Sequence, residues 1–221
     1  MEYTDKEYCL EVWGSGACFT RPELKVERVS YDVITPSAAR AIFEAIFWKP
    51  AISWQVTKIE VLNPIRWASI KRNEVGCLSP KPIFVEETRQ QRNTLYLKDV
   101  RYRIWAKQVF IPVRNRIGDT AENHENENPG KYHATFERRA SKGQCFNQPY
   151  LGTREFSASF KLVNPSIDEM PAPIRDSRDL GIMLYDMDFS DKQNIQAMFY
   201  RPVMDNGVII VPPINSPEIL R

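Results

Sequence analysis

Apolar residues recur along the first 164 positions in the spacings of alternating strands and helices. Residues 8–13 predict a first strand, which Gly14-Ser15-Gly16 ends. Thr35-Pro36 then offers a helix cap followed by proline at the first helical position, and Lys49-Pro50 stops that helix. The inward face of this helix is predicted at helical spacing to consist of Ala38, Ala41, Ile42, Ala45 and Ile46.

The middle of the chain predicts extended structure. Residues 54–61 alternate with one break in phase, and a second extended piece covers residues 65–70. Residues 72–94 are polar and contain glycine and prolines, so we expect a flexible insertion there. Residues 96–113 carry the strongest strand signal.

The strand at 96–113 has two chemically different faces. One face carries valine, tyrosine, isoleucine and alanine at 100, 102, 104 and 106. The other carries Arg101, Arg103, Trp105 and Lys107. Cations interleaved with an aromatic ring are typical of a nucleic-acid-binding sheet, and the alternative is a solvent face whose long side chains shield the sheet.

A second helix is predicted to begin at Asn128-Pro129 and to end at Gly143. Tyr132, Phe136 and Ala140 are spaced by four residues and form its inward face. A polar loop over residues 118–130, which we expect to be mobile, precedes the helix, and a strand over residues 156–163 follows it.

The predicted order over residues 1–164 is therefore strand, helix, strand, strand, helix, strand. This order predicts an α+β, ferredoxin-like (RRM-like) βαββαβ domain, a fold shared by many RNA-binding modules. Short strands at 182–187, 196–201 and 207–211 predict a small C-terminal antiparallel sheet within residues 165–221. Asp205-Asn206-Gly207 predicts a hairpin turn inside it.

Composition and charge narrow the class of protein. A hydrophobic content of 43 % in 221 residues is ordinary for a soluble globular chain, and no apolar run approaches the ~20 residues of a membrane helix. The polar first residues are unlike a signal peptide, so we expect a cytoplasmic protein. Residues 1–164 carry a net charge of +6 and residues 165–221 one of −4. The basic part suits a polyanionic partner, and the acidic part suits either a protein partner or solvent.

The cysteines predict neither a metal site nor disulfides. None of the four pairs as Cys-x-x-Cys or lies near a histidine at metal-ligand spacing. We expect reduced thiols and no cofactor. The four are Cys9, Cys18, Cys77 and Cys145.

The candidate chemistry lies at the start of the second helix. Cleaving RNA without a metal needs groups that transfer a proton near neutral pH. It also needs a cation that stabilises the negative charge of the reacting phosphate. His133, one of two histidines, has a suitable unperturbed pKa, Lys131 supplies a compact cation, and Tyr132 lies between them. The other histidine, His124, lies in the polar loop. The basic residues expected to hold an RNA backbone, or else to form a solvated face, are Arg138, Arg139, Lys142 and Arg154.

Several motifs, in their joint order, resemble one known family. They are Val12-Trp13-Gly14, Phe19-Thr20-Arg21-Pro22, Ser30-Tyr31, Thr35-Pro36-Ser37-Ala38-Ala39-Arg40, Ile46-Phe47-Trp48-Lys49-Pro50, Tyr96-Leu97-Lys98-Asp99-Val100-Arg101-Tyr102, Gly130-Lys131-Tyr132 and Tyr150-Leu151-Gly152-Thr153-Arg154-Glu155-Phe156. The chain resembles the CRISPR-associated Cas-five family in its subtype I-C (Dvulg-type) branch.

The resemblance implies a function. Members of this branch cut precursor CRISPR RNA within the repeat stem-loop without a metal, leaving a 5′-hydroxyl and a 2′,3′-cyclic phosphate. They then stay on the 5′ handle of the guide and join the large and backbone subunits of the interference complex. Some relatives also cleave DNA with a metal.

The family's catalytic residues match this chain incompletely. The resemblance implies a tyrosine where Phe47 stands, and a Lys-His pair where Lys131 and Tyr132 stand, with His133 one residue late. On an ideal helix Lys131 and His133 would diverge by about 200°. Tyr132 is a candidate to replace the missing hydroxyl.

Three functions follow from these observations. The first is a guide-RNA-processing endoribonuclease, and the second is a non-catalytic scaffold that binds the RNA handle. The third is a metal-dependent DNA nuclease, for which the sequence offers only the loop carboxylates Glu122, Glu125 and Glu127, more simply explained as solvated.

Overall fold

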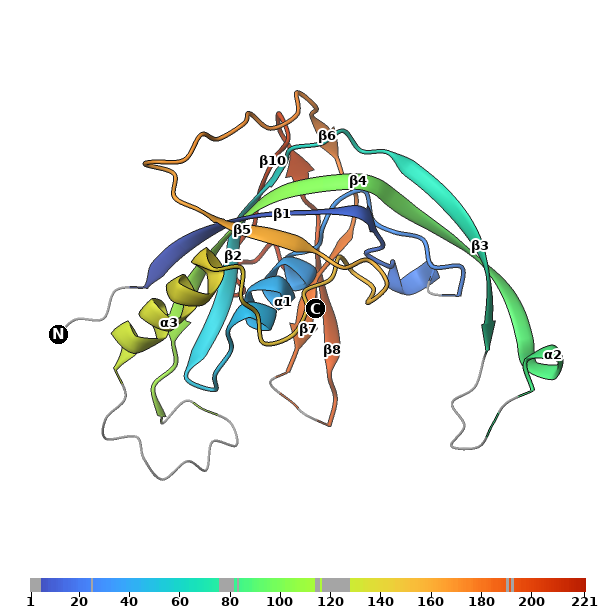
Figure 1. The fold of residues 1–221 in the computed structure, drawn as a ribbon, viewed down its shortest axis with the longest axis horizontal. Helices are drawn as coiled ribbons and strands as arrows, with labels where there is room; N and C mark the ends of the chain where they lie inside the picture. Colours follow the sequence, from blue (N-terminus) through green and yellow to red (C-terminus); the bar gives the residue numbers. More distant parts are fainter. Residues whose placement is uncertain are drawn as a thin grey trace.

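The computed structural model describes residues 5–24, 26–75, 82, 84–113, 116, 128–189, 191 and 193–221. In this part of the chain a six-stranded antiparallel sheet dominates, with helices on its concave side (Figure 1). Its strands are β1 (Lys6–Ala17), β2 (Ile52–Val61), β3 (Trp67–Val75), β4 (Arg89–Phe110), β5 (Ser159–Val163) and β10 (Val208–Ile210). They lie in the order β10-β2-β4-β1-β5, and β3 pairs with the distal half of β4. The protein is thus a mixed α/β protein made mostly of strands.

Strand β1 continues through the glycines that were predicted to end it. A Cβ on Gly14 would lie 2.6 Å from Leu151 Cδ1, and one on Gly16 would lie 2.6 Å from Phe156 Cε1. The prediction was wrong because these glycines make room for side chains that pack on the strand, rather than for a turn.

Helix α1 (Pro36–Ile46) begins where the sequence predicted, with the Ala38 amide donating to Thr35 Oγ1 at 3.3 Å. Its buried face includes Ile42 and Ile46 as expected, but Ala41 is exposed. The large ring of Phe43 turns inward instead, because burying it removes far more apolar surface from water than burying an alanine. The buried residues are Pro36, Ala39, Ile42, Phe43 and Ile46.

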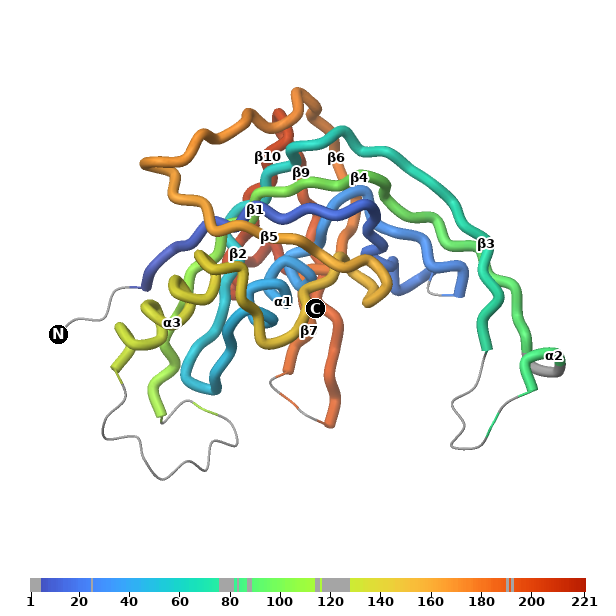
Figure 2. Tube along the Cα trace, viewed as in Figure 1, coloured from blue at the N-terminus to red at the C-terminus, as the bar shows by residue number. Residues whose placement is uncertain are grey.

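The polar segment predicted as an insertion is largely paired. Strand β3 and the first part of β4 form a hairpin that extends beyond the sheet, with helix α2 (Val85–Thr88) at its far end (Figure 2). Residues 72–75 and 89–94 of the expected flexible insertion therefore belong to strands. Backbone pairing stabilises them although both faces are largely polar, so no apolar alternation marked them in the sequence. The break in phase predicted for β2 is a register shift between Val56 and Lys58.

Helix α3 (Pro129–Ser141) follows the prediction closely. Asn128 caps it by accepting from the Gly130 amide at 2.9 Å, and Gly143 after its end has φ +64°. Phe136 is fully buried, with ring centroids 4.7 Å from Tyr8 and 4.6 Å from Trp54. Most of the loop predicted to be mobile, residues 118–127, lies outside the described residues, as does His124.

The C-terminal region forms strand pairs of its own and also contributes a strand to the main sheet. Strands β6 (Arg178–Asp179) and β9 (Val203–Met204) pair with each other, as do β7 (Met183–Asp188) and β8 (Gln196–Tyr200). Strand β10, however, pairs with β2 at the edge of the main sheet. The predicted Asp205-Asn206-Gly207 turn is confirmed, with positive φ at Asn206 and Gly207.

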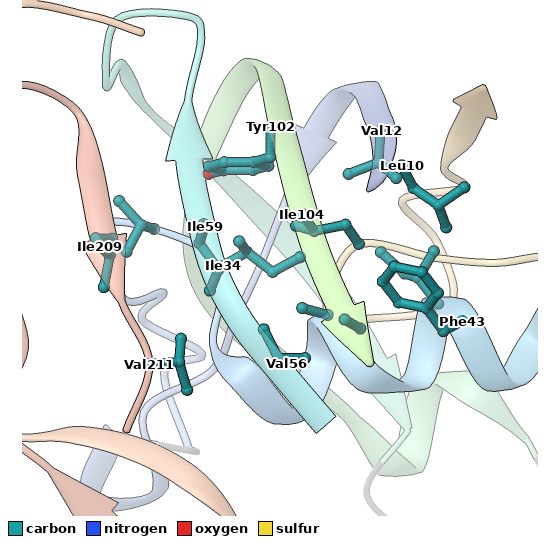
Figure 3. Packing of buried hydrophobic residues seen from close by; sticks show 14 of the residues in the cluster. Leu10, Val12, Ile34, Phe43, Val56, Ile59, Tyr102, Ile104, Ile209 and Val211 are labelled. Atoms are coloured by element: carbon teal, nitrogen blue, oxygen red, sulfur yellow. The ribbon is translucent and has the colours of Figure 1, made fainter. Parts of the chain in front are cut away.

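One cluster of buried side chains joins these parts (Figure 3). It brings Leu10 of β1, Phe43 of α1 and Ile104 of β4 together with Ile209 and Val211 near the C-terminus. Residues 165–221 therefore share the core of residues 1–164. Among the described residues, none of the helices is long and apolar enough to cross a bilayer.

Candidate active site

The first turn of α3 presents three candidate side chains in different directions. The helix is regular from Pro129, so side chains at 131, 132 and 133 project at successive rotations of about 100°. Burial of Phe136 fixes the rotation of the helix against the sheet. Tyr132 consequently points toward the end of α1, and His133 toward the start of β1, as their ring contacts with Phe47 and Tyr8 show.

Tyr132 lies against Phe47, the position where the family resemblance implies a tyrosine. Their ring centroids are 6.3 Å apart, and Phe110 lies 6.4 Å from Tyr132 on a nearly parallel plane. Phe47 is only 3 % exposed. Arg139 lies over the Phe47 ring at 5.3 Å and donates to the Ile46 carbonyl oxygen at 3.0 Å. The fold thus brings the two positions together, but an aromatic contact stands where a Tyr–His pair was implied.

His133 belongs to a polar cluster on the other side of the helix. Its Nδ1 lies 3.0 Å from the hydroxyl oxygen of Tyr8, which donates to Glu137 Oε1 at 3.1 Å. Lys6 donates to the same carboxylate oxygen and forms an ion pair with it. The cluster joins β1 to one face of α3.

The cluster favours the neutral form of His133 more than solvent favours the neutral form of an exposed histidine. Partial burial lowers the pKa of His133, and the positive charge of Lys6 lowers it further, whereas Glu137 and Asp5 act in the opposite direction. Burial opposes ionisation of Glu137, but its hydrogen bond and ion pair with Lys6 outweigh this and lower the pKa of its carboxyl group. The arrangement at neutral pH is therefore a neutral imidazole beside an ionised carboxylate.

Lys131 is exposed at the N-terminal end of α3 and has no ion pair within the described residues. A helix N-terminus favours anions because its free N–H groups and the helix dipole point toward them. Lys131 and His133 leave the helix in the divergent directions predicted for an ideal helix. The described part of the chain therefore supplies a cation and a base on separate sides of one turn.

The cations predicted to bind RNA fall into two groups. Lys107, Arg138, Lys142 and Arg154 are exposed and form no ion pair within the described residues. Arg101 is bound to Glu11 at 2.6 Å, and Arg139 is engaged with the end of α1 as described above. Within the described residues, the first group is thus exposed and unpaired, whereas Arg101 and Arg139 are engaged with protein groups.

Arg103 is the clearest departure from the predicted RNA-binding face. Its side chain is 3 % exposed, pairs with Glu60 at 2.5 Å and donates to the Pro171 carbonyl oxygen at 2.9 Å. The segment 164–177 crosses the convex face of the sheet above it (Figure 1). This face of β4 is partly covered by protein. Arg103 therefore stabilises the fold, and we no longer expect it to bind RNA.

Sequence reasoning did not find Lys6, Tyr8 and Glu137. Tyr8 was read only as part of a strand, and it lies 125 residues from His133 in the chain. Nothing local in the sequence marks the pairing. Two sequence features could have predicted the cluster. One is an inward-facing tyrosine at the end of a strand, and the other is a histidine and a glutamate four residues apart on a helix.

The thiols carry no metal-binding arrangement in the described residues. Cys9, Cys18 and Cys145 are free, and burial raises the pKa of the Cys9 thiol to about 12. Across the described ranges, His, Cys, Asp and Glu side chains do not gather in threes at metal-binding distances. Cys77, Glu122, Glu125 and Glu127 lie outside these ranges.

Comparison with known sequences assigns this chain to a protein family. Residues 7–212 match the family described as "CRISPR-associated protein (Cas_Cas5)". The chain belongs to the CRISPR-associated Cas5 family. The resemblance read from the sequence motifs is thereby confirmed.

Two relatives in this family are closely similar. One, the CRISPR pre-crRNA endoribonuclease Cas5d of Mannheimia succiniciproducens, is 46 % identical over 233 residues, covering 96 % of this chain and 97 % of the relative. The protein of the same name from Thermus thermophilus is 47 % identical over 195 residues, covering 87 % of this chain and 79 % of the relative.

Solved structures share the fold. One described as a CRISPR-associated protein has a TM-score of 0.73 and 25 % identity, with full coverage of both chains. A chain of a CRISPR RNA-guided surveillance complex has a TM-score of 0.53 and 13 % identity, covering 95 % of this chain and 92 % of its own. At that identity the second likeness concerns the fold alone.

Proposed function

We propose that this Cas5 family protein is an endoribonuclease that cuts precursor CRISPR RNA within its repeat. The observation that carries the proposal is the 46 % identity to a pre-crRNA endoribonuclease over nearly the whole of both chains. The first turn of α3 adds chemical support, because it combines an exposed lysine with a histidine whose pKa is lowered.

The reaction is attack of a ribose 2′-hydroxyl on the adjacent phosphorus. His133 accepts the 2′ proton, the P–O5′ bond breaks, and the products are a 2′,3′-cyclic phosphate and a 5′-hydroxyl. Lys131 leaves the turn in a different direction from His133, so its long side chain must fold back over the anion-favouring end of α3 to stabilise the negative charge of the pentavalent phosphorane. Tyr132 is the candidate to return a proton to the departing 5′-oxygen.

The exposed cations hold the RNA backbone in this proposal. Arg138 and Lys142 lie on and just after α3, and Arg154 lies in the loop that packs beside β1. Their charges are directed to solvent, as phosphate binding requires. Lys107 lines a groove of about 900 Å³ beside Trp48 and is a further contact.

We also infer that the sheet is a ferredoxin-like βαββαβ arrangement. The order β5-β1-β4-β2, its antiparallel pairing, and the placement of α1 and α3 on one face support this. In keeping with this family, the protein is proposed to remain on the 5′ handle and to join the large and backbone subunits of an interference complex.

A second candidate function is an RNA-handle-binding scaffold without catalysis. The specific observation in its favour is the ring contact between buried Phe47 and partly buried Tyr132, which leaves no Tyr–His pair at those two positions. In this case the exposed cations bind RNA and a separate enzyme cuts it.

Cleavage of a 5′-labelled cognate repeat RNA in EDTA tests the two candidates. Wild type is compared with Lys131→Ala, Tyr132→Phe and His133→Ala, and RNA binding is measured for each. Lys161→Ala is the matched control, because Lys161 is an exposed lysine that lies on β5 and not on α3. A substrate with a 2′-deoxyribose at the cut site lacks the nucleophile.

The endoribonuclease predicts one cut in EDTA, abolished by the 2′-deoxy substitution and by Lys131→Ala or His133→Ala while binding persists. Lys161→Ala should cut like wild type. Tight binding by wild type without a cut would establish the scaffold instead.

A further inference from the structure

The hydrogen bonds around Tyr8 define where its proton lies. A tyrosine hydroxyl has one hydrogen to donate, and an ionised carboxylate only accepts. Because Tyr8 donates to Glu137 Oε1 at 3.1 Å, its oxygen must act as the acceptor toward His133 Nδ1 at 3.0 Å. The Nδ1 atom therefore carries hydrogen, and in the neutral ring Nε2 carries the lone pair.

We propose that Tyr8, held by Glu137, is a positioning residue that fixes His133 in the Nδ1-protonated tautomer and makes Nε2 its basic nitrogen. This inference rests on the proposed endoribonuclease function, which needs His133 as a base in a fixed orientation. Tyr8 does not touch RNA in this role, because its side chain is buried at 5 % exposure. In this role it acts through His133.

The packing around Tyr8 holds its hydroxyl in one place. The Tyr8 ring lies 4.7 Å from Phe136 and 5.9 Å from Trp54, both of them core residues. Phe136 belongs to the same helix as His133 and Glu137, so ring packing and the two hydrogen bonds fix β1 and α3 together. A buried tyrosine loses little rotamer freedom when it makes these bonds.

Among the described residues, the charged groups around His133 come from both the start of β1 and α3. Lys6 and Asp5 lie on β1 or just before it, and Glu137 lies one turn further along α3. Lys6 forms an ion pair with Glu137, and its effect on the pKa of His133 opposes that of the carboxylate. The carboxylate can therefore orient the tyrosine proton without converting His133 into a permanent cation.

Nitrogen NMR of the histidine side chains tests the tautomer directly. Uniformly ¹⁵N-labelled protein is measured at a pH where His133 is neutral, and His124→Asn assigns the two imidazoles. We expect His133 to show a protonated Nδ1 and an unprotonated Nε2. Wild type with the hydrogen on Nε2 would overturn the proposal.

Two variants make the test specific. Glu137→Ala removes the acceptor for the Tyr8 proton, so Tyr8 can donate to Nδ1 and the His133 hydrogen should move to Nε2. Tyr8→Phe keeps the packed ring but removes the acceptor for Nδ1–H, so the His133 resonances should shift. The control is Tyr185→Phe, which deletes another buried hydroxyl, bonded at 2.9 Å to the Pro212 carbonyl, and should leave them unchanged.

Single-turnover cleavage supplies the second readout. Tyr8→Phe should lower the rate constant about tenfold or more with unchanged RNA affinity, because the base loses its orientation. Tyr185→Phe should cleave at the wild-type rate. Failure of wild type to cleave defeats the proposed function, whereas normal tautomer and rate in Tyr8→Phe defeat the positioning role.

Discussion

Phe47 and Tyr132 lie in contact, with ring centroids 6.3 Å apart, where the end of α1 meets the first turn of α3. The two positions are 85 residues apart in the sequence. Both depart from the residues that the family resemblance implies, and the structure shows that the two departures occur at one place. Phe47 is buried and Tyr132 is partly buried, and Arg139 lies over the Phe47 ring and donates to the Ile46 carbonyl oxygen.

Phe47→Ala should destabilise the fold. Truncating a large buried aromatic side chain leaves a cavity, and we expect a loss of about 3 kcal/mol in the free energy of unfolding. Urea unfolding measures it. The neighbouring Trp48 is 53 % exposed, so Trp48→Ala should change stability by no more than about 1 kcal/mol. Equal effects of the two variants would contradict the buried position of Phe47.

Arg103→Met should destabilise the protein without altering how RNA binding depends on salt. Removing one member of a buried ion pair leaves Glu60 paired, among the described residues, with Lys58 alone, and we expect a loss of about 3 kcal/mol. Adding Glu60→Leu to this variant should recover much of the loss, because an uncompensated carboxylate is no longer buried. Urea unfolding and salt titration of RNA binding check both parts. A lower salt dependence would return Arg103 to the RNA-binding set.

Arg138→Ala, Lys142→Ala and Arg154→Ala should each weaken RNA binding in a salt-dependent way. Each removes one exposed cation, so the slope of log affinity against log salt should fall by about one unit or slightly less. Binding titrations at several salt concentrations measure this slope. Arg178→Ala is the control, since Arg178 is paired with Asp176 in the C-terminal region. An unchanged slope in all three variants would place the RNA elsewhere.

Gly152→Ala should be far more harmful than Gly143→Ala. Both glycines have positive φ, but a Cβ at 152 would lie 2.0 Å from the Cys18 carbonyl oxygen, whereas at 143 it meets nothing within 4 Å. We expect a loss of about 1 kcal/mol for Gly143→Ala from backbone strain alone, and at least about 3 kcal/mol for Gly152→Ala. Thermal or urea unfolding compares them. Similar losses would mean that the loop at 152 moves aside freely.

The cleavage rate should keep its maximal value as the pH falls somewhat below the usual pKa of histidine. The base form of His133 is required, and burial and Lys6 lower its pKa, so the rate should fall only as pH drops through that lowered value. Lys6→Gln removes the cation, raises the pKa of His133 and should move this acid limb to higher pH. Single-turnover rates from pH 5 to pH 8 test it. An acid limb that ignores Lys6→Gln would show that another group titrates.

Features specified by neighbouring residues were predicted well from the sequence. Thr35-Pro36 and Asn128-Pro129 do begin the two long helices, and Asn206-Gly207 does form a turn, because caps and positive φ depend on residues a few positions apart. The alternation of β4 was equally visible. The motifs identified the family for the same reason, since they are local strings in a fixed order.

The sequence by itself determined the helix starts, the turn, the alternation of β4 and the candidate run from Lys131 to His133. The tertiary structure decided which of these side chains meet. It buried Arg103 against Glu60, set Tyr132 on Phe47 and joined His133 to Tyr8 across 125 residues. It also decided that β10 completes the main sheet. Such pairings depend on how α1 and α3 pack on the curved sheet, and packing is set by the shapes of many distant side chains together rather than by any local pattern.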